Sequence, residues 1–283
     1  MENMGNTADQ LRRTEAFRAL HHSGETLVLP NAWDCISARI FEEAGFPAIA
    51  TTSSGVSFSL GVPDGEHLDP EWLLNVVGRM TDTLSVPLTV DIEAGYSNGD
   101  ISKLTVFIDR LLVKGAVGIN LEDGSAATKS LQNLKLQQEL IRTVKAVAAG
   151  KSCDIFINAR TDAMMYAPGE KEDRVKIALE RAAAFEEAGA DGVFVPFVQD
   201  MDTVATLKEG IRLPLNILAN EHLDIAELKR LGVNRISTGS RPILATLALL
   251  REIASELKGA DGWKQLYKSG ITYAETNKLL GRS

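Results

Sequence analysis

Short apolar runs rich in β-branched residues alternate with longer amphipathic stretches along almost the whole chain. This alternation predicts strands joined by helices, the arrangement that builds a parallel sheet. Runs such as PLTV and DIFIN are almost continuously hydrophobic, as is typical of strands that are buried on both faces. Eight strands are expected, at residues 27–32, 48–53, 87–93, 118–123, 154–161, 192–197, 214–219 and 235–239.

The connecting stretches repeat one device, an amphipathic segment that ends in a glycine shortly before the next strand. Gly45, Gly115, Gly189 and Gly232 are therefore expected to end helices, where a left-handed residue closes the last turn. Such a unit, repeated without a break in composition, favours one (β/α)8 TIM barrel, for which about 250 residues are usual. An open doubly wound sheet with eight strands is the alternative.

One α/β domain is expected over residues 1–283, with the barrel at about 25–257 and a C-terminal helical tail at about 258–283. The tail carries large side chains that need a surface to bury against, namely Trp263, Leu266, Tyr267 and Tyr273. That surface is either the bottom of the barrel or a neighbouring subunit.

Acidic side chains outnumber basic ones by 38 to 30, so that the net charge is −8. Binding to phosphates needs a basic surface, which argues against a nucleic-acid partner and an anionic membrane. No apolar run approaches the roughly 20 residues of a membrane span, and residues 1–13 lack the apolar core of a signal peptide. We therefore expect a cytoplasmic protein whose two cysteines, Cys35 and Cys153, are reduced and buried.

Carboxylates gather where consecutive strands are expected to end, which is where barrel enzymes carry their chemistry. Asp91 and Glu93 end the third strand, Glu122 and Asp123 end the fourth, and Asp64 lies in the loop after the second. Alternation along a strand places Asp91 and Glu93 on one side. Converging carboxylates repel one another unless a cation holds them, and an oxygen-only set indicates Mg2+ or Mn2+. Helix capping or pairing with Lys and Arg is the alternative role.

Arg160 ends the fifth strand, almost opposite these acids. Its planar fork suits a carboxylate or phosphate of a ligand, and it equally suits a salt bridge to Glu93 or Glu122. The end of the second strand, Ser53-Ser54-Gly55, offers small residues whose backbone N–H groups can approach an anion.

Other chemistries find little support at the strand ends. No strand ends in a lysine, so a Schiff-base aldolase lacks its nucleophile. None of the four histidines (His21, His22, His67 and His222) lies on an expected strand, which argues against zinc and Ser-His hydrolases. His21 and His22 are expected at the solvated end of a helix.

Five motifs occur in order along the chain, within a region that runs from residue 29 to residue 239. They are Ser53-Ser54-Gly55, Leu60-Gly61-Val62-Pro63-Asp64, Asp91-Ile92-Glu93-Ala94-Gly95-Tyr96, Asn120-Leu121-Glu122-Asp123 and Asn158-Ala159-Arg160-Thr161-Asp162. Together they resemble the isocitrate lyase and phosphoenolpyruvate mutase superfamily. The resemblance implies a Mg2+-dependent barrel that cleaves or forms C–C or C–P bonds of small 2-oxo or 2-hydroxy acids through a pyruvate-type enolate.

The resemblance also implies roles for individual residues. Asp91 would bind the metal directly, while Asp64, Glu93 and Glu122 would hold it through water. The substrate-binding candidates are Ser53, Ser54, Gly55, Asp91, Arg160 and Asn220, with Ser54 and Gly55 at the substrate carboxylate and Arg160 at the far anionic group. The catalytic candidates are Asp64, Glu122, Arg160 and Lys129. Members of the superfamily exchange their last helix between subunits, which implies a homodimer or homotetramer.

The sequence departs from the superfamily in the loop after Glu122-Asp123, which reads GSAATKS. It lacks the Lys-Lys-Cys-Gly-His motif, which excludes a lyase with a cysteine proton donor. Mutases and phosphonopyruvate hydrolases usually have a lysine where Gly124 stands. The chemically active residues of this loop are Ser125, Thr128, Lys129 and Ser130. Of these, Lys129 could donate a proton or neutralise a substrate anion when the loop closes, and the alternative is that it is simply solvated.

A decarboxylase needs little from such a loop, because carbon dioxide leaves without an acid. The expected function is therefore a Mg2+-dependent C–C lyase of a small di- or tricarboxylic acid, similar to an oxaloacetate decarboxylase or a substituted-malate lyase. The alternatives are C–P bond chemistry of the phosphonopyruvate hydrolase or phosphoenolpyruvate mutase type, and a barrel that binds a dicarboxylate without turnover.

Overall fold

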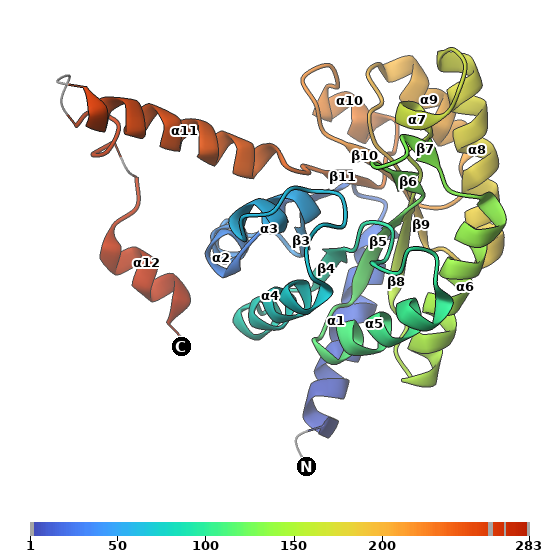
Figure 1. Cartoon of the computed structure of the whole chain (residues 1–283), viewed down its shortest axis with the longest axis horizontal. Helices are drawn as coiled ribbons and strands as arrows, with labels where there is room; N and C mark the ends of the chain where they lie inside the picture. The colour runs from blue at the N-terminus through green and yellow to red at the C-terminus, as the bar shows by residue number, and fades with distance from the viewer. Residues whose placement is uncertain (1–2, 260–262, 269, 282–283) are drawn as a thin grey trace.

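A computed structural model describes residues 3–259, 263–268 and 270–281, and it contains a parallel barrel surrounded by helices (Figure 1). The nine strands follow the order β1-β11-β10-β9-β8-β5-β4-β3-β2. The first expected strand is interrupted at Pro30, which gives β1 (Leu27–Leu29) and β2 (Asn31–Ala32). β1 pairs with β11 and β2 pairs with β3, so the sheet closes on itself. The TIM-type barrel is thus confirmed, and the open doubly wound alternative is wrong.

The other barrel strands each fall within one of the expected runs. They are β3 (Ile49–Thr51), β4 (Leu88–Asp91), β5 (Gly118–Glu122), β8 (Phe156–Arg160), β9 (Gly192–Val195), β10 (Leu215–Leu218) and β11 (Arg235–Ser237). Two short strands, β6 (Gly124–Ser125) and β7 (Ser130–Leu131), form a separate antiparallel hairpin.

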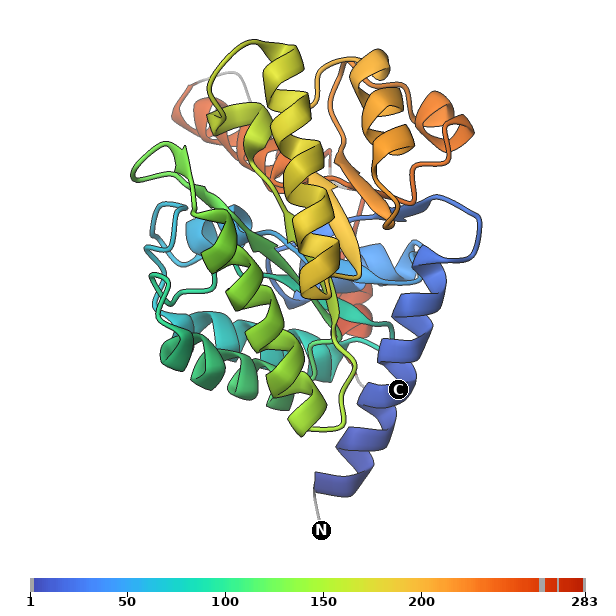
Figure 2. The same cartoon turned by 90° about the vertical axis from the view of Figure 1, so that its right-hand side faces the viewer.

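Helices cover the outside of the strands, and Figure 2 shows α6 and α8 standing side by side there. The helices are α1 (Asn3–His21), α2 (Cys35–Glu43), α3 (Ser53–Ser59), α4 (Pro70–Thr83), α5 (Ile101–Val113), α6 (Leu134–Gly150), α7 (Ala163–Tyr166), α8 (Lys171–Ala188), α9 (Met201–Gly210), α10 (Ile225–Arg230), α11 (Arg241–Lys258) and α12 (Tyr273–Leu280). Within the described ranges, none of them combines the length and apolarity needed to cross a membrane.

Local sequence explains where these helices begin and end. The four glycines expected after helices all have positive φ angles, between 74° and 98°, which confirms them as helix ends. Aspartates accept hydrogen bonds from the first turns of α2, α4, α5, α9 and α10. The acids predicted for the site are not among these caps, so helix capping does not account for them.

Helix α1 covers the end of the barrel where the strands begin. Phe17 is fully buried and packs edge-on against Phe156, and the ring of His21 stacks on Phe156 at 4.0 Å. His21 is only 2% exposed, so its expected place at a solvated helix end is wrong. Its Nδ1 bonds the carbonyl oxygen of Phe17, and burial lowers its pKa to about 3. The polar N-terminal helix thus closes this end of the barrel with the side chains of Phe17 and His21.

The buried His21 predicts a loss of stability in acid. The unfolded chain takes up a proton near pH 6.5 and the folded chain near pH 3, so stability is full above pH 6.5 and falls below it. At pH 5 the loss is about 2 kcal/mol, from 1.5 pH units at about 1.4 kcal/mol each. Urea unfolding gives the free energy of unfolding of the native protein and of His21→Asn at pH 7 and at pH 5. The difference between the two proteins should be smaller at pH 5 than at pH 7 by this amount. An unchanged difference would contradict the assignment.

Helix α11 leaves the barrel instead of packing beside α10 (Figure 1). Ile243 is its one buried residue in the described part, whereas Leu244, Leu247, Leu249, Leu250 and Leu257 are exposed. Helix α12 returns to α2, where Arg39 Nε donates to the Leu279 carbonyl oxygen at 2.8 Å. Trp263, Tyr267 and Tyr273 are 61%, 80% and 87% exposed, so these aromatic side chains do not bury against the bottom of the barrel.

Candidate active site

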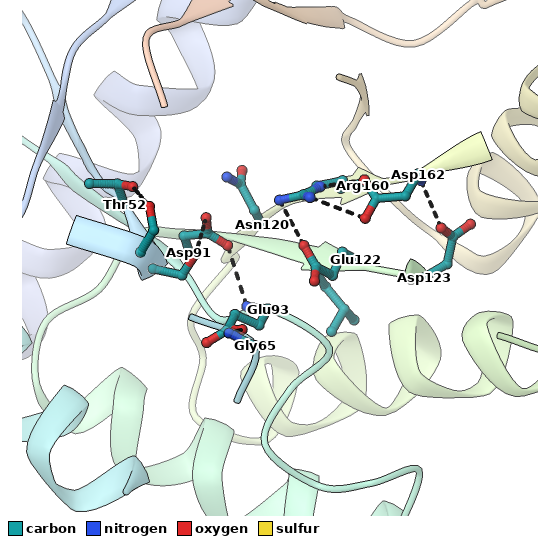
Figure 3. A network of polar contacts seen from close by, with 12 residues as sticks. Thr52, Gly65, Asp91, Glu93, Asn120, Glu122, Asp123, Arg160 and Asp162 are labelled. Carbon is teal, nitrogen blue, oxygen red and sulfur yellow. Dashed lines mark hydrogen bonds and ion pairs between the residues drawn. The ribbon is translucent and has the colours of Figure 1, made fainter. Parts of the chain in front are cut away.

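The ends of three neighbouring strands bring the acids and Arg160 together (Figure 3). Asp91 ends β4, Glu122 lies on β5 and Arg160 ends β8. Asp91 is in register with Asn120, and Glu122 is in register with Arg160. The prediction that these side chains meet at one edge of the barrel is therefore confirmed.

Asp91 is buried at the end of β4, where it is 8% exposed. Ser53 Oγ donates to Asp91 Oδ2 at 3.2 Å, and the Glu93 N–H donates to Oδ1 at 3.3 Å. The N–H of Asp91 itself donates to Thr51 Oγ1 at 2.9 Å. These contacts fix both the backbone and the carboxylate of Asp91 at the base of the site.

Arg160 is neutralised by two acids. Its Nη1 pairs with Glu122 Oε2 at 2.7 Å, and its Nε and Nη2 donate to the two oxygens of Asp162 at 2.7 and 3.1 Å. The guanidinium also lies over the rings of Phe194 and Phe197, 5.8 and 5.9 Å from their centroids. Burial lowers the pKa of Arg160, but the charges of the two acids outweigh it and raise that pKa. Of the two salt bridges expected for Arg160, the one to Glu122 is formed.

Glu93 turns away from Asp91 because its backbone has a positive φ of 49°, so the strand alternation ends at Asp91. Glu93 Oε2 accepts from the N–H groups of Gly65 and Glu66 at 3.0 and 2.7 Å, and the Tyr96 hydroxyl donates to Oε1 at 2.7 Å. Burial raises the pKa of Glu93 to about 7, although the Tyr96 hydrogen bond opposes this. Glu93 thus clamps the loop that carries Asp64.

The acids raise one another's pKa values. Burial raises the pKa of Glu122, and the charges of Asp162, Asp91 and Glu93 add to this against the opposing charge of Arg160. Asp64 is solvent-exposed at the rim, yet partial desolvation and then the charge of Asp91 raise its pKa. The site therefore carries an excess of negative charge. Across the described ranges, no three His, Cys, Asp or Glu side chains are arranged to hold a metal ion.

The residues expected to bind substrate differ in how they are held: three lie together at the start of α3, whereas Asn220 links two loops. The first turn of α3 contains Ser53, Ser54 and Gly55, all of them buried. The Ser53 hydroxyl donates to Asp91, and the Ser54 hydroxyl lies 3.0 Å from Thr52 Oγ1. Asn220 donates from Nδ2 to the Val198 carbonyl oxygen at 2.8 Å, so it ties the loops after β9 and β10 together.

Lys129 lies in the turn between β6 and β7, where it is exposed and has a φ of 49°. Buried Asp123 holds this hairpin, because it pairs with Arg181 at 2.9 Å and its carbonyl oxygen accepts from the Gln132 N–H. The hairpin is therefore anchored at its base while its tip, including Lys129, faces solvent.

Comparison with known proteins identifies the family. The sequence profile described as phosphoenolpyruvate phosphomutase matches residues 17–258. The chain belongs to this family. It is thereby a member of the isocitrate lyase/phosphoenolpyruvate mutase superfamily, as its motifs predict.

Several members resemble the chain over most of its length. An uncharacterized protein of Mycobacterium tuberculosis is 38% identical and covers 94% of this chain and 96% of that protein. The 2,3-dimethylmalate lyase of Eubacterium barkeri is 28% identical, with 94% of this chain and 93% of the lyase covered. The oxaloacetate decarboxylase of a Bradyrhizobium species is also 28% identical, with 95% and 93% covered.

Two solved structures share the fold. A suspected phosphonomutase from Burkholderia cenocepacia has a TM-score of 0.82 at 33% identity, covering 87% of this chain and 99% of that one. A phosphonopyruvate hydrolase in complex with oxalate and Mg2+ has a TM-score of 0.83 at 25% identity, covering 94% of each chain. These relatives support chemistry of the lyase and mutase kind at the level of the superfamily.

Gly124 lies against Asp162 at the start of the β6–β7 hairpin. A Cβ atom at position 124 would overlap the carboxylate of Asp162 and lie 2.8 Å from its Cγ. Asp162 is 2% exposed and holds Arg160 side-on, so it has little room to move. A side chain at position 124 would therefore have to displace Asp162 from Arg160.

Sequence reasoning missed three residues that shape the site. Asp162 pairs with Arg160, Tyr96 holds Glu93, and Arg235 reaches Asn120 inside the barrel. The two-residue spacing between Arg160 and Asp162 is a local pattern that suggests a shared side of the strand end. No local pattern pointed to Arg235, because its partner is 115 positions away.

Proposed function

We propose that this family member is a Mg2+-dependent lyase that cleaves a C–C bond of a small 2-oxo or 2-hydroxy di- or tricarboxylic acid through a pyruvate-type enolate. The observation that carries the proposal is the occlusion of position 124 by Asp162. It leaves no space for the lysine that mutases and phosphonopyruvate hydrolases usually carry at this position. The similarity to a decarboxylase and to a dimethylmalate lyase supports the same choice.

The donors around Asp91 fit a hard divalent cation. They are all carboxylate oxygens. Burial and neighbouring acids raise the pKa values of Asp64, Glu93 and Glu122, and a cation bound among them would relieve the repulsion between these acids. Asp91 would hold the ion directly, and Asp64 and Glu122 would hold it through water, in keeping with the lack of a three-acid cage in the described ranges. Glu93 would act chiefly on the Asp64 loop. Such an ion supplies Lewis-acid stabilisation of a developing enolate.

The remaining residues would bind and shield the substrate. Ser54 and Gly55 follow Ser53, which donates to Asp91, in the first turn of α3, and they would face the substrate carboxylate. Because Glu122 and Asp162 already neutralise Arg160, a distal substrate anion would have to share the guanidinium with them. Phe194 and Phe197 shield one side of that guanidinium from water, which strengthens its attraction for an anion. Lys129 would reach the site only if the hairpin closed.

The proposal is tested by incubating the purified protein with Mg2+ and a panel of oxaloacetate, substituted malates, 2-methylisocitrate and phosphonopyruvate. Pyruvate, 2-oxo acid and phosphate release are followed separately. Release of a carbonyl product from a dicarboxylate or tricarboxylate supports the lyase. Phosphate release from phosphonopyruvate alone would favour C–P chemistry, which the similarity to a phosphonopyruvate hydrolase keeps as the second candidate. Oxalate binding without any turnover would indicate a non-catalytic dicarboxylate-binding barrel.

We also propose that the protein is a homo-oligomer in which α11 packs against a neighbouring subunit. The leucines of α11 lie on a helix that leaves its own barrel, with Leu247 39% and Leu250 54% exposed. Exposed apolar stretches of this kind mark protein–protein contacts.

Light scattering coupled to gel filtration should give a dimer or tetramer for the native protein. The double variant Leu247→Glu/Leu250→Glu should shift it to a monomer, because a charge cannot be buried in an apolar interface. Ile225→Glu changes a residue of similar exposure on α10 and should leave the assembly unchanged. A monomeric native protein at micromolar concentration would refute the proposal.

A further inference from the structure

An arginine side chain crosses the inside of the barrel beneath the acids. Arg235 lies on β11 and is 1% exposed. Its Nε donates to Ser237 Oγ at 3.2 Å, and its Nη2 donates to Asn120 Oδ1 at 3.3 Å. Asn120 is on β5, which is separated from β11 by β10, β9 and β8 in the ring of strands. The guanidinium therefore reaches from one wall of the barrel to the opposite wall.

The surroundings of Arg235 are polar but uncharged. Asn158 Nδ2 donates to Asn120 Oδ1 at 2.9 Å, and Asn216 Nδ2 donates to Ser237 Oγ at 3.0 Å. Within the described part of the chain, Nε and Nη2 of Arg235 bond neutral oxygens, and its Nη1 is buried without a hydrogen-bond partner. A buried cation without a paired anion costs several kcal/mol, so its charge calls for a physical explanation.

The site above supplies the balancing charge. Burial lowers the pKa of Arg235 to about 9, and Asp91 is the acid whose charge opposes this. Asp91 lies in register with Asn120, which Arg235 bonds. The titratable group that faces Arg235 from α1 is His21, which is neutral at pH 7 because its pKa is about 3. Arg235 therefore keeps its charge near neutral pH and faces the acidic group from below.

We propose that Arg235 is a positioning residue of this active site, a fixed positive charge that acts through Asn120 and Asp91 on whatever binds above them. A fixed cation attracts anions and repels cations across a low-dielectric interior. Arg235 would thus strengthen the binding of a dianionic substrate and limit the affinity for the divalent ion. This inference rests on the proposed function, because it assumes that Mg2+ and a carboxylate ligand share the site.

The test compares Arg235→Gln, which removes the charge, with Arg235→Lys, which keeps it. Titration calorimetry measures the Kd for Mg2+ alone and the Kd for oxalate in saturating Mg2+. For Arg235→Gln we expect oxalate binding to weaken about tenfold and Mg2+ binding to tighten about threefold. Arg235→Lys should stay within about twofold of the native protein for both ligands. Arg212→Gln, on the surface, controls for the change in net charge and should alter neither.

The outcomes separate this inference from the proposed function. A native protein that binds neither Mg2+ nor oxalate overturns both. A native protein that binds both, with the same affinities in folded Arg235→Gln, overturns only the role of Arg235. Equal shifts in the Lys and Gln variants would mean that packing matters and charge does not. If Arg235→Gln does not fold, Arg235→Met takes its place, because it also removes the charge while keeping a long unbranched side chain, and unchanged affinities in that variant would overturn the role of Arg235.

Discussion

Replacing Asp91 with asparagine is expected to lower kcat/KM at least about 1000-fold, which corresponds to about 4 kcal/mol of lost transition-state stabilisation. Asparagine keeps the size of the side chain and can still accept from Ser53. It lacks the charge that would hold a divalent ion, so the loss isolates the ionic role of Asp91. The measurement is product release from the member of the substrate panel that the native protein turns over.

Calorimetry with Mg2+ gives this prediction a second readout, since Asp91→Asn should also abolish measurable binding of the ion. Asp202→Asn removes an exposed carboxylate from the first turn of α9 and serves as the matched control, with unchanged turnover expected. Retention of more than about a tenth of the native activity in Asp91→Asn would refute the assignment of Asp91 as the metal ligand.

The variant Gly124→Ala is expected to damage both stability and turnover. The added methyl group would overlap Asp162, and inserting a carbon into a packed region costs about 1–3 kcal/mol. Because Asp162 holds Arg160 side-on, its displacement would move the guanidinium, and a shift of about 1 Å at a reacting site lowers turnover roughly 100-fold. Urea unfolding measures the first effect and kcat/KM the second.

Gly150→Ala is the matched control, because a Cβ at Gly150, at the end of α6, meets nothing within 4 Å. That variant should keep the native activity. A Gly124→Ala protein with native turnover would show that Asp162 moves freely. There would then be no steric reason against a lysine at position 124. The preference for C–C over C–P chemistry would lose its support.

Several parts of the site were predictable from local sequence. The eight apolar runs gave the strands, and parallel strands end at one edge, so the ends of β4, β5 and β8 had to meet. The meeting of Asp91 with Glu122 and the pairing of Glu122 with Arg160 follow from that geometry. The position of Glu93 did not follow, because alternation holds only within a strand and the backbone turns left-handed at Glu93.

The N- and C-terminal segments show the same limit. Helix α1 is polar overall, and its burial depends on Phe17 and His21 meeting Phe156, a contact between residues more than 130 positions apart. The departure of α11 from the barrel, which leaves its leucines exposed, was likewise not encoded in the amphipathic pattern of the helix, because that pattern does not say which surface a helix packs against.

The sequence by itself determined the barrel and the end of it at which Asp91, Glu122 and Arg160 meet, because strand period and chain order are local properties. Tertiary structure alone decided that Asp162 occludes position 124, that Glu93 holds the Asp64 loop, and that Arg235 spans the barrel to Asn120. These contacts depend on side-chain directions and on distances across a closed sheet, which no periodic pattern in the chain encodes.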